Sequence, residues 1–501
     1  MLAMSTHLSI LHTTTKNKII QMKKTLILFT CFTICFGCTK VDDLLEDPNR
    51  ATSVTPDLIL TNLEIQAFNN VSLSAALASR YLTFTDNIDQ YQYYGWQRSN
   101  FSDYDNLKQS QKMIEEAKRT NIEVYQILGD FFKAYFTIEL TQVFGDIPFT
   151  QALSVEDGIL TPEYDQQKEI YLKVLDMLKN ASIALSSNTE PINGDIIYFG
   201  DKLKWRKLIN SYSLRVLMSL SNKTDEGSLD IINRFNEIVS NLTEFPVFTS
   251  NEDNADLEFV NVQGNRYPLF NSNSLQTAYY LEKSFVERLQ TLQDPRLFVF
   301  ADKKPSAADA TNGDFTAYGG LYGSAELSVN AAEAVSGEAS RINSRYYSNP
   351  VNEPSILMSY AELSFILAES AVRNWTTVNV NDAYEAGITA SMEFYGISIN
   401  SDYLGQDGVK LNEENEIASI LTQKHIAMFL NTGWQIFYEQ RRTGFPEFNI
   451  DGGGILNAGK IPKRWMYPES ELVNNNKNLQ TAIQRQFSGG DNINGNMWLL
   501  Q

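Results

Sequence analysis

Apolar residues recur every three to five positions along several stretches of the chain, the spacing of one face of an α-helix. Such stretches occur at residues 125–143, 170–185, 205–220, 356–371, 382–395 and 413–429. Because each predicted helix has a single apolar face, the helices must pack against one another to bury it. The pattern therefore predicts a mainly helical, all-α fold.

The predicted helices come in pairs joined by short connections. Lys168 and Lys202 stand at similar helix starts, 34 residues apart. This interval equals the repeat length of tetratricopeptide helix pairs, which stack into a curved scaffold. We therefore expect a tetratricopeptide-like arrangement of helix pairs.

Three long stretches between the predicted helices lack helical spacing and are rich in Tyr, Asn, Gly and Ser. They are residues 84–106, 245–280 and 305–350. Loops of this length in a compact domain usually carry function. Nothing between residues 38 and 501 resembles a low-complexity linker, so we expect a single domain, 38–501, with long irregular loop insertions.

The N-terminal segment resembles a secretory signal peptide. Two lysines follow Met22, residues 26–36 are apolar, and Gly37 precedes Cys38. We predict a signal peptide over residues 1–37, in which Met22 is a second candidate for the start of translation. The Gly37-Cys38 pair resembles the lipobox of bacterial lipoproteins, whose cysteine is acylated, so we predict lipidation at Cys38. Plain cleavage without lipid is the alternative.

Acidic residues follow the predicted lipidation site, at Asp42 and Asp43. They are similar to the signal that exports Bacteroidetes lipoproteins to the cell surface. An ordinary solvated tether would have the same composition, and both interpretations stay open. No later stretch has the ~18 continuous apolar residues of a membrane helix, so we expect a lipid to hold the protein at the membrane.

The charge and the rare residue types exclude several functions. The chain carries a net charge of −19, and its first 37 residues contain four lysines and no acid. The remainder has 60 acidic residues against 37 basic ones, a net charge of −23, which repels nucleic acid. Residues 39–501 contain no cysteine and only one histidine, His425. We therefore expect no disulfide, no metal site built from cysteines or several histidines, no cofactor and no histidine-based catalysis. Whether a metal ion assists ligand binding stays open.

Short motifs follow one another along nearly the whole chain: 141–149 (TQVFGDIPF), 294–297 (DPRL), 359–362 (SYAE), 439–446 (EQRRTGFP) and 461–468 (IPKRWMYP). In this order and spacing they resemble the SusD/RagB family of Bacteroidetes outer-membrane lipoproteins, in particular its second SusD-like subgroup. The resemblance implies four tetratricopeptide-like helix pairs overlaid by variable loops. It also implies a partner, a SusC-like TonB-dependent transporter, on which the protein sits as a hinged lid.

The ligands of this family are mostly oligosaccharides, with peptides in some branches. The resemblance therefore implies a cell-surface lipoprotein of the outer membrane that captures an oligosaccharide and delivers it to the transporter, without catalysis. A peptide-binding member of the same family is the first alternative, and a surface glycoside hydrolase is the second. The motifs of the family are structural, so they assign no ligand contacts in this chain.

The strongest local candidate for ligand binding lies in the first long loop. Sugars present apolar C–H faces ringed by hydroxyl groups, so their sites need flat aromatic faces together with amide or guanidinium groups. This loop offers both at Tyr91, Tyr93, Tyr94, Trp96, Arg98 and Tyr104, and a second loop repeats the chemistry at Arg266 and Tyr267. We predict glycan contacts at these residues. The alternative is that the aromatic rings pack as core.

Two further features each have a structural and a functional interpretation. Arg441 and Arg442 could grip a carboxylate, although an ion pair that fixes the chain after the last predicted helix is favoured. His425 lies among apolar residues of a predicted helix, which favours a core histidine over a ligand-binding one. We predict no catalytic residues, because no catalytic motif occurs in the chain.

Overall fold

The computed structural model describes residues 54–399 and 401–501. The predicted signal peptide 1–37 and the predicted lipidation site Cys38 lie outside these residues, so both stay predictions. Thr55–Gln501 form one compact unit. Within the described ranges, none of the helices combines the length and the apolar character needed to span a bilayer.

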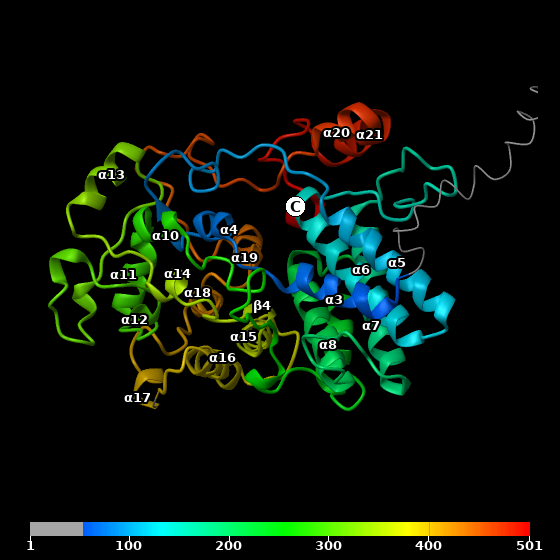
Figure 1. Ribbon diagram of the computed structural model, residues 1–501, viewed down its shortest axis with the longest axis horizontal. Coiled ribbons are helices and arrows are strands. Elements are labelled where there is room, and N and C mark those ends of the chain that lie inside the picture. The colour runs from blue at the N-terminus through cyan, green and yellow to red at the C-terminus, as the bar shows by residue number, and fades with distance from the viewer. Residues whose placement is uncertain (1–53, 400) are drawn as a thin grey trace, which may run out of the picture. The chain divides into compact units, whose positions relative to one another are not determined.

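A first group of helices forms one side of this unit: α3 (Pro56–Phe68), α5 (Asp103–Thr120), α6 (Glu123–Phe144), α7 (Gln167–Ser187) and α8 (Lys202–Ser219). A two-residue connection makes α5 and α6 a helix hairpin. α6 then packs on α7 and α7 on α8, so neighbours along the chain are neighbours in space. Figure 1 shows these blue-to-green helices side by side.

Local residues set where these helices begin and end. Asn121 ends α5 in a left-handed conformation with φ 55°, which Asn tolerates better than most residues. Gly145 ends α6 with φ 89°, where a Cβ would be strained. Asp201 caps α8 by accepting the N–H groups of Leu203 and Lys204, which satisfies two donors that the first turn leaves unpaired.

A second group of helices comes later in the chain: α15 (Tyr360–Val372), α16 (Val380–Phe394), α18 (Glu416–Ala427) and α19 (Gln435–Thr443). α15 packs on α16 and α18, and it also packs on α8 of the first group. Helix α15 therefore joins the two groups into one core.

The remaining helices are short: α4 (Leu73–Ala78), α9 (Ile231–Ser240), α10 (Asn273–Thr277), α11 (Lys283–Thr291), α12 (Leu297–Phe300), α13 (Leu327–Val335), α14 (Arg345–Ser348), α17 (Ser401–Leu404), α20 (Glu469–Asn474) and α21 (Asn476–Gln486). Single 3-10 turns lie at Ser221–Lys223, Asn251–Asp253, Pro305–Ala307, Phe315–Ala317 and Trp498–Leu500. Several of these elements interrupt the stretches that the sequence predicted as loops.

Two short antiparallel strand pairs tie distant loops together. β1 (Leu82–Phe84) pairs with β3 (Tyr279–Leu281), with Leu82 opposite Leu281. β2 (Ala255–Leu257) pairs with β4 (Ser355–Met358), with a register shift after Ala255. Each pair fastens one end of a long loop to the helical core.

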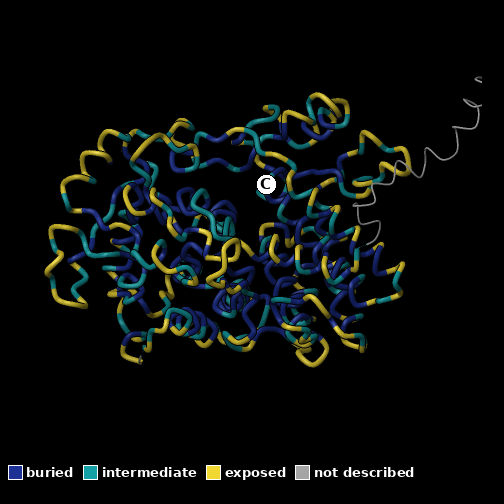
Figure 2. The backbone as a smooth tube through the Cα atoms, viewed as in Figure 1, coloured by how far each residue is buried: buried dark blue, intermediate teal, exposed yellow. Residues whose placement is uncertain are grey.

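The hydrophobic core follows the helices. Figure 2 shows buried backbone along the helices and exposed residues concentrated in the outer connections. Helix α6 is buried over most of its circumference, at positions that include Leu128, Phe132 and Phe136. The prediction of a mainly helical scaffold of packed helix pairs with long irregular loops is confirmed.

Candidate functional site

The loop that carries most of the predicted ligand contacts is fixed by its own backbone and by a distant segment. The Asp89 carboxylate accepts the N–H groups of Tyr91 and Gln92 at 2.7 and 3.0 Å, which closes a tight turn. Further along, the N–H of Leu456 donates to the carbonyl of Tyr93 at 2.8 Å. The loop is therefore held against the chain that follows α19.

Four of the predicted contact residues are buried rather than displayed. Tyr93, Tyr94 and Trp96 are at most 1% exposed, and Tyr267 is 2% exposed. The Tyr94 hydroxyl donates to the carbonyl of Ala78 at 2.8 Å. The expectation that these rings face solvent is thus corrected, because their large apolar surfaces are packed inside the protein. The hydroxyls of Tyr93 and Tyr267 are buried without a hydrogen-bond partner among the described residues.

The buried Trp96 lies at the centre of this packing. Its indole N–H donates to the carbonyl of Arg464 at 3.1 Å, and its ring stacks on Trp465 with 4.8 Å between centroids and 14° between planes. A ring covered in this way offers no face to a sugar. Trp96 is therefore a core residue, as the alternative interpretation of the sequence has it.

The other predicted contacts are reached by solvent to different extents. Tyr91, Arg98 and Tyr104 are half-buried, and Arg266 is exposed. Arg98 donates to the carbonyl of Tyr467 at 2.6 Å and pairs with Asp491 at 2.9 Å. The hydroxyl of Tyr104 donates to the carbonyl of Pro148 at 2.5 Å. Ligand contact by these four residues stays a prediction.

The predicted contacts of the second loop, Arg266 and Tyr267, have neighbours of their own. Among the described residues, no recorded hydrogen bond or ring contact joins Arg266 or Tyr267 to residues 91–104. Arg266 instead donates to the side chain of Asn261 at 2.9 Å, and the ring of Tyr267 contacts Phe259 at 5.5 Å. We therefore treat Arg266 as a separate candidate.

Trp434 is a candidate that sequence reasoning missed. It immediately precedes α19, and its half-buried ring meets the ring of Tyr91 at 5.5 Å with 62° between planes. The rings of Trp434 and Trp465 are perpendicular to each other, with 4.8 Å between centroids and 89° between planes. We call the two half-buried rings, Tyr91 and Trp434, the aromatic platform. The two residues are separated by more than 300 positions, so only the fold brings them together.

The platform has the mixed chemistry that a sugar site needs. Its two rings rest on the buried Trp96, at 5.6 Å from Tyr91 and 6.1 Å from Trp434. Gln90, which precedes Tyr91, and Gln97, which follows Trp96, are both exposed. Burial, and then the nearby Asp89 carboxylate, raises the pKa of Tyr91 above its usual value. Its hydroxyl therefore remains a neutral donor and acceptor at physiological pH.

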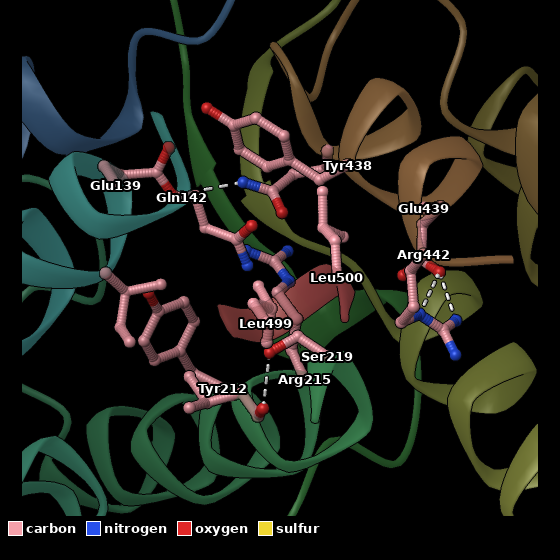
Figure 3. Close-up of a pocket in the computed structure, with 13 residues that line it drawn as sticks. Glu139, Gln142, Tyr212, Arg215, Ser219, Tyr438, Glu439, Arg442, Leu499 and Leu500 are labelled. Carbon is pink, nitrogen blue, oxygen red and sulfur yellow. Dashed lines mark hydrogen bonds and ion pairs between the residues drawn. The ribbon is translucent and has the colours of Figure 1, made fainter. Parts of the chain in front are cut away.

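A small cavity lies beside the start of α19, and Figure 3 shows its lining, with Glu139, Tyr438 and Arg442 among the labelled residues. Its volume is about 30 Å³, enough for about one water molecule. Burial, and then the nearby Asp103, raises the pKa of Glu139 to about 7. A sugar ring does not fit this cavity, so Glu139 lacks the access that a glycosidase acid needs.

The two adjacent arginines hold the scaffold together. Arg442 pairs with Glu369 of α15 at 2.5 and 2.8 Å and also contacts Glu439. Burial opposes the ionisation of Glu439, yet Arg442 and Lys424 lower its pKa to about 2. Arg441 donates to the carbonyl and the side chain of Gln142, both at 2.9 Å. These contacts agree with the interpretation that the two arginines fix the chain, rather than bind a carboxylate ligand.

His425 is a satisfied core histidine. It is 1% exposed and stacks on Tyr81 at 4.3 Å between centroids. Its Nε2 lies 3.0 Å from the carbonyl of Ser79, and its Nδ1 lies 3.0 Å from a nitrogen of Arg288. Since an arginine can only donate, Nδ1 accepts and Nε2 carries the proton. Burial, and then Arg288, lowers the pKa of the ring well below its usual value.

Comparison with known proteins identifies the family. The model of the family SusD-like_2, described as "Starch-binding associating with outer membrane", matches residues 48–468. The chain is 40% identical to a SusD homologue from Bacteroides fragilis, covering 90% of this chain and all of the other, with a TM-score of 0.83. It is 37% identical to an outer-membrane protein from Bacteroides vulgatus with an inferred role in nutrient binding, with 89% and 100% coverage and the same TM-score.

More distant structures share the fold alone. A chitin-binding protein is 24% identical to this chain, with a TM-score of 0.71 and coverage of 89% of this chain and 100% of the other. Comparison with curated protein sequences finds no significant match. The family model spans most of the chain, and the overall structure agrees with those of two relatives that are 37% and 40% identical to it. The chain therefore belongs to the SusD-like_2 family.

Proposed function

We propose that this protein is a cell-surface lipoprotein, anchored through Cys38, that captures an oligosaccharide and delivers it to a SusC-like TonB-dependent transporter. The observation that carries the proposal is the family match over residues 48–468, because that family is described by starch binding and outer-membrane association. The inferred role of the Bacteroides vulgatus relative in nutrient binding supports the same conclusion.

In this proposal the aromatic platform is the main contact surface. Tyr91 and Trp434 stack on the apolar face of a sugar, while Gln90 and Gln97 bond its hydroxyl groups. The rings already rest on Trp96, so little side-chain freedom is lost when the ligand binds. Arg98, Tyr104 and the more distant Arg266 are further candidate contacts.

Binding without turnover is the second part of the proposal. The SusD family consists of binding proteins, and the platform places aromatic rings and amides, rather than a pair of carboxylic acids, against the ligand. Release of reducing sugar on incubation with polysaccharide would support the glycoside hydrolase alternative instead. The expected result is a glycan recovered unchanged.

A glycan is favoured over a peptide as the ligand. The family description names starch, and the fold also occurs in a chitin-binding protein. The net charge of the chain, −19, disfavours strongly anionic polysaccharides in the absence of a local basic pocket. We therefore expect a neutral glycan, and a peptide panel would reveal the alternative.

Affinity electrophoresis through gels that contain neutral or acidic polysaccharides tests this proposal. We expect retardation by at least one neutral glycan and a loss of affinity of about tenfold in Trp434→Ala, because one stacking face is removed. Phe199→Ala is the matched control, since Phe199 is an exposed aromatic residue elsewhere in the fold, 84% accessible. Equal loss in both variants, or no retardation by any glycan, would contradict the proposal.

A further inference from the structure

A cavity of about 260 Å³ is lined by residues from the start of α7, the end of α21 and the 3-10 turn Trp498–Leu500. Its lining includes Gln166, Lys168, Glu226, Arg485, Trp498 and Gln501. We call it the Trp498 cavity. Its volume approaches the ~300 Å³ at which small-molecule pockets begin, and it is far larger than the cavity beside α19. None of its lining residues belongs to the aromatic platform.

Trp498 supplies this cavity with an aromatic ring that the protein holds in place. Its indole N–H donates to Oε1 of Glu226 at 3.4 Å, and the ammonium of the buried Lys223 lies over the ring, 5.1 Å from its centroid. The turn that contains Trp498 also packs on α7. Trp498 lines the cavity and is only half-buried, so part of its ring is open to a ligand.

Polar side chains that solvent reaches surround this ring. Lys168 pairs with Glu226, and Arg485 pairs with Asp146, each at 2.5 Å. The side chains of Lys168, Glu226 and Arg485 are 31%, 30% and 34% exposed, so a ligand in the cavity can contact each of them. The ion pairs limit the freedom of these side chains before a ligand arrives, which lowers the entropic cost of binding.

Several hydrogen-bonding groups of this lining remain available. The ammonium of Lys168 donates one hydrogen bond, to Glu226, and so keeps two N–H groups. Arg485 donates through Nε and Nη2, and within the described part of the chain no hydrogen bond joins its Nη1 to another residue. The amide of the exposed Gln166 likewise has no recorded partner among the described residues. The cavity therefore combines an aromatic ring with N–H donors and an amide oxygen.

The charges of the lining favour a neutral ligand. Its two cationic side chains and its two carboxylates are equal in number, and each cation is already paired with a carboxylate. An ionic ligand would have to compete with these pairs. A sugar ring carries no charge, and it has an apolar C–H face for Trp498 and hydroxyl groups for the remaining donors.

We propose that the Trp498 cavity binds one neutral sugar ring, which stacks on Trp498 and bonds through its hydroxyl groups to Gln166, Lys168 and Arg485. This second site goes beyond the proposed function, because capture on the aromatic platform does not depend on it. Since the volume of the cavity suits a single ring, we expect monosaccharides to bind.

The indole N–H signals of the wild-type protein test the proposal without any change to the fold. The chain has six tryptophans, and the variant Trp498→Phe identifies the signal of Trp498 in a ¹H–¹⁵N correlation spectrum by its loss. The protein is titrated with glucose, galactose, mannose and N-acetylglucosamine. We expect at least one sugar to shift the Trp498 signal saturably, while the signal of the fully buried Trp205 stays in place. Absence of a shift with all four sugars would overturn the proposal.

The variant Gln166→Ala tests one of the polar contacts. Gln166 is exposed and its side chain does not cap α7, so the substitution carries little risk to the fold. We expect it to weaken the response of Trp498 to the sugar about threefold or more, as loss of one hydrogen bond does. Gln276→Ala is the matched control, because Gln276 is an exposed glutamine on α10. Equal affinity in the two variants, or tighter binding of sulfate or glycylglycine than of any sugar, would overturn the proposal.

The variant Trp434→Ala separates this site from the aromatic platform. We expect it to lose polysaccharide retardation and to keep the response of the Trp498 signal to monosaccharide. Loss of that response in Trp434→Ala would overturn the proposal, because the shift would then originate at the platform. A Trp498 response without retardation by any polysaccharide would remove the proposed function and leave the Trp498 site standing. The reverse result would remove the Trp498 site alone.

Discussion

Trp96 and Trp434 belong to one aromatic cluster, but solvent reaches only one of them. Trp96 is covered by Trp465 on one face and bonded through its N–H to a backbone carbonyl. Trp434 stands half-buried at the rim of the same cluster. Removal of the first ring therefore leaves a cavity, whereas removal of the second leaves a surface without its stacking face.

We predict that Trp96→Ala lowers the free energy of unfolding by about 3–5 kcal/mol, as large-to-small substitutions in a packed core do. Trp434→Ala should cost clearly less, about 1–2 kcal/mol. Chemical denaturation with tryptophan-independent detection measures both values. Similar losses in the two variants would show that Trp434 is as much a core residue as Trp96.

Glu64 is a buried acid that faces another acid. The N–H of Ile196 donates to its carboxyl group at 2.9 Å, and burial, and then the nearby Asp195, raises its pKa to about 10. Asp195 itself accepts four hydrogen bonds, among them one from the indole N–H of Trp205 at 2.8 Å. Glu64 is therefore protonated in the folded protein at neutral pH, and it is ionised in the unfolded chain.

This difference in pKa makes stability depend on pH. The folded state binds one more proton than the unfolded state between about pH 4.5 and pH 10. The contribution of Glu64 to the free energy of unfolding is therefore fully present below about pH 4.5. It is lost as the pH rises, by up to about 1.4 kcal/mol per pH unit. We predict that the free energy of unfolding of Glu64→Gln depends less on pH in this range, because an amide does not titrate.

Urea denaturation of the wild type, Glu64→Gln and Glu287→Gln between pH 5 and pH 9 measures the effect. Glu287 is an exposed glutamate on α11, so its variant should follow the wild-type profile. Parallel profiles for the wild type and Glu64→Gln would show that Glu64 is ionised in the folded protein.

At the scale of the elements, buried ion pairs fix how the helices meet. Arg215 of α8 pairs with Glu362 of α15 at 2.5 Å, and Lys424 of α18 pairs with Glu439 of α19 at 2.8 Å. Arg442 of α19 completes the network through Glu369 of α15. Loss of one member leaves its partners charged, buried and unpaired.

We predict that Arg442→Met lowers the free energy of unfolding by about 3–5 kcal/mol, the usual cost of breaking a buried ion pair. Arg373→Met is the matched control, because Arg373 pairs with the same Glu369 from a position that is 24% exposed. It should cost at most about 1 kcal/mol. Equal melting temperatures of Arg442→Met and the wild type would contradict the structural role of Arg442.

The helices were predictable from the chain because their signal is local. The apolar stripe over residues 170–185 reappears in the buried side of α7, since a 3.6-residue period directly encodes which face is buried. The conformation of residues 89–98 was not predictable. Asp89 closes a local turn, but the position of the segment also depends on contacts with Leu456 and Met466, more than 350 positions away, and no local pattern reports such contacts.

The same limit applies to the candidate site. Chemistry alone pointed to the aromatic segment that contains Tyr91, one of the two rings of the platform proposed here to bind the ligand. It could not tell the half-buried Tyr91 from the buried Tyr93 and Tyr94, because all three share composition and neighbours. In the sequence, only the preceding glycine, Gly433, distinguishes the position of Trp434. In the structure Gly433 has a φ of 60° and forms a turn before α19.

At the scale of the whole molecule, the proposal joins a binding unit to a membrane anchor. The thiols of the chain are Cys31, Cys35 and Cys38, and only Cys38 follows a small residue after the apolar run. We predict that Cys38→Ala abolishes incorporation of an alkyne-labelled fatty acid and moves the protein from the membrane fraction to the supernatant.

Cys35→Ala is the control for the anchor, because it removes a neighbouring thiol within the same apolar run. It should retain the fatty-acid label and the membrane fraction. Labelling that persists in Cys38→Ala would show that another residue is acylated or that the anchor is placed elsewhere.

The most direct test of the account is calorimetric titration of the wild-type protein with oligosaccharides from each polysaccharide that retards it, followed by mass spectrometry of the recovered ligand. We predict saturable binding, loss of about tenfold in affinity in Trp434→Ala, and recovery of the ligand at its original mass. Shortened ligand, or affinity that Trp434→Ala leaves unchanged, would contradict capture on the aromatic platform without turnover.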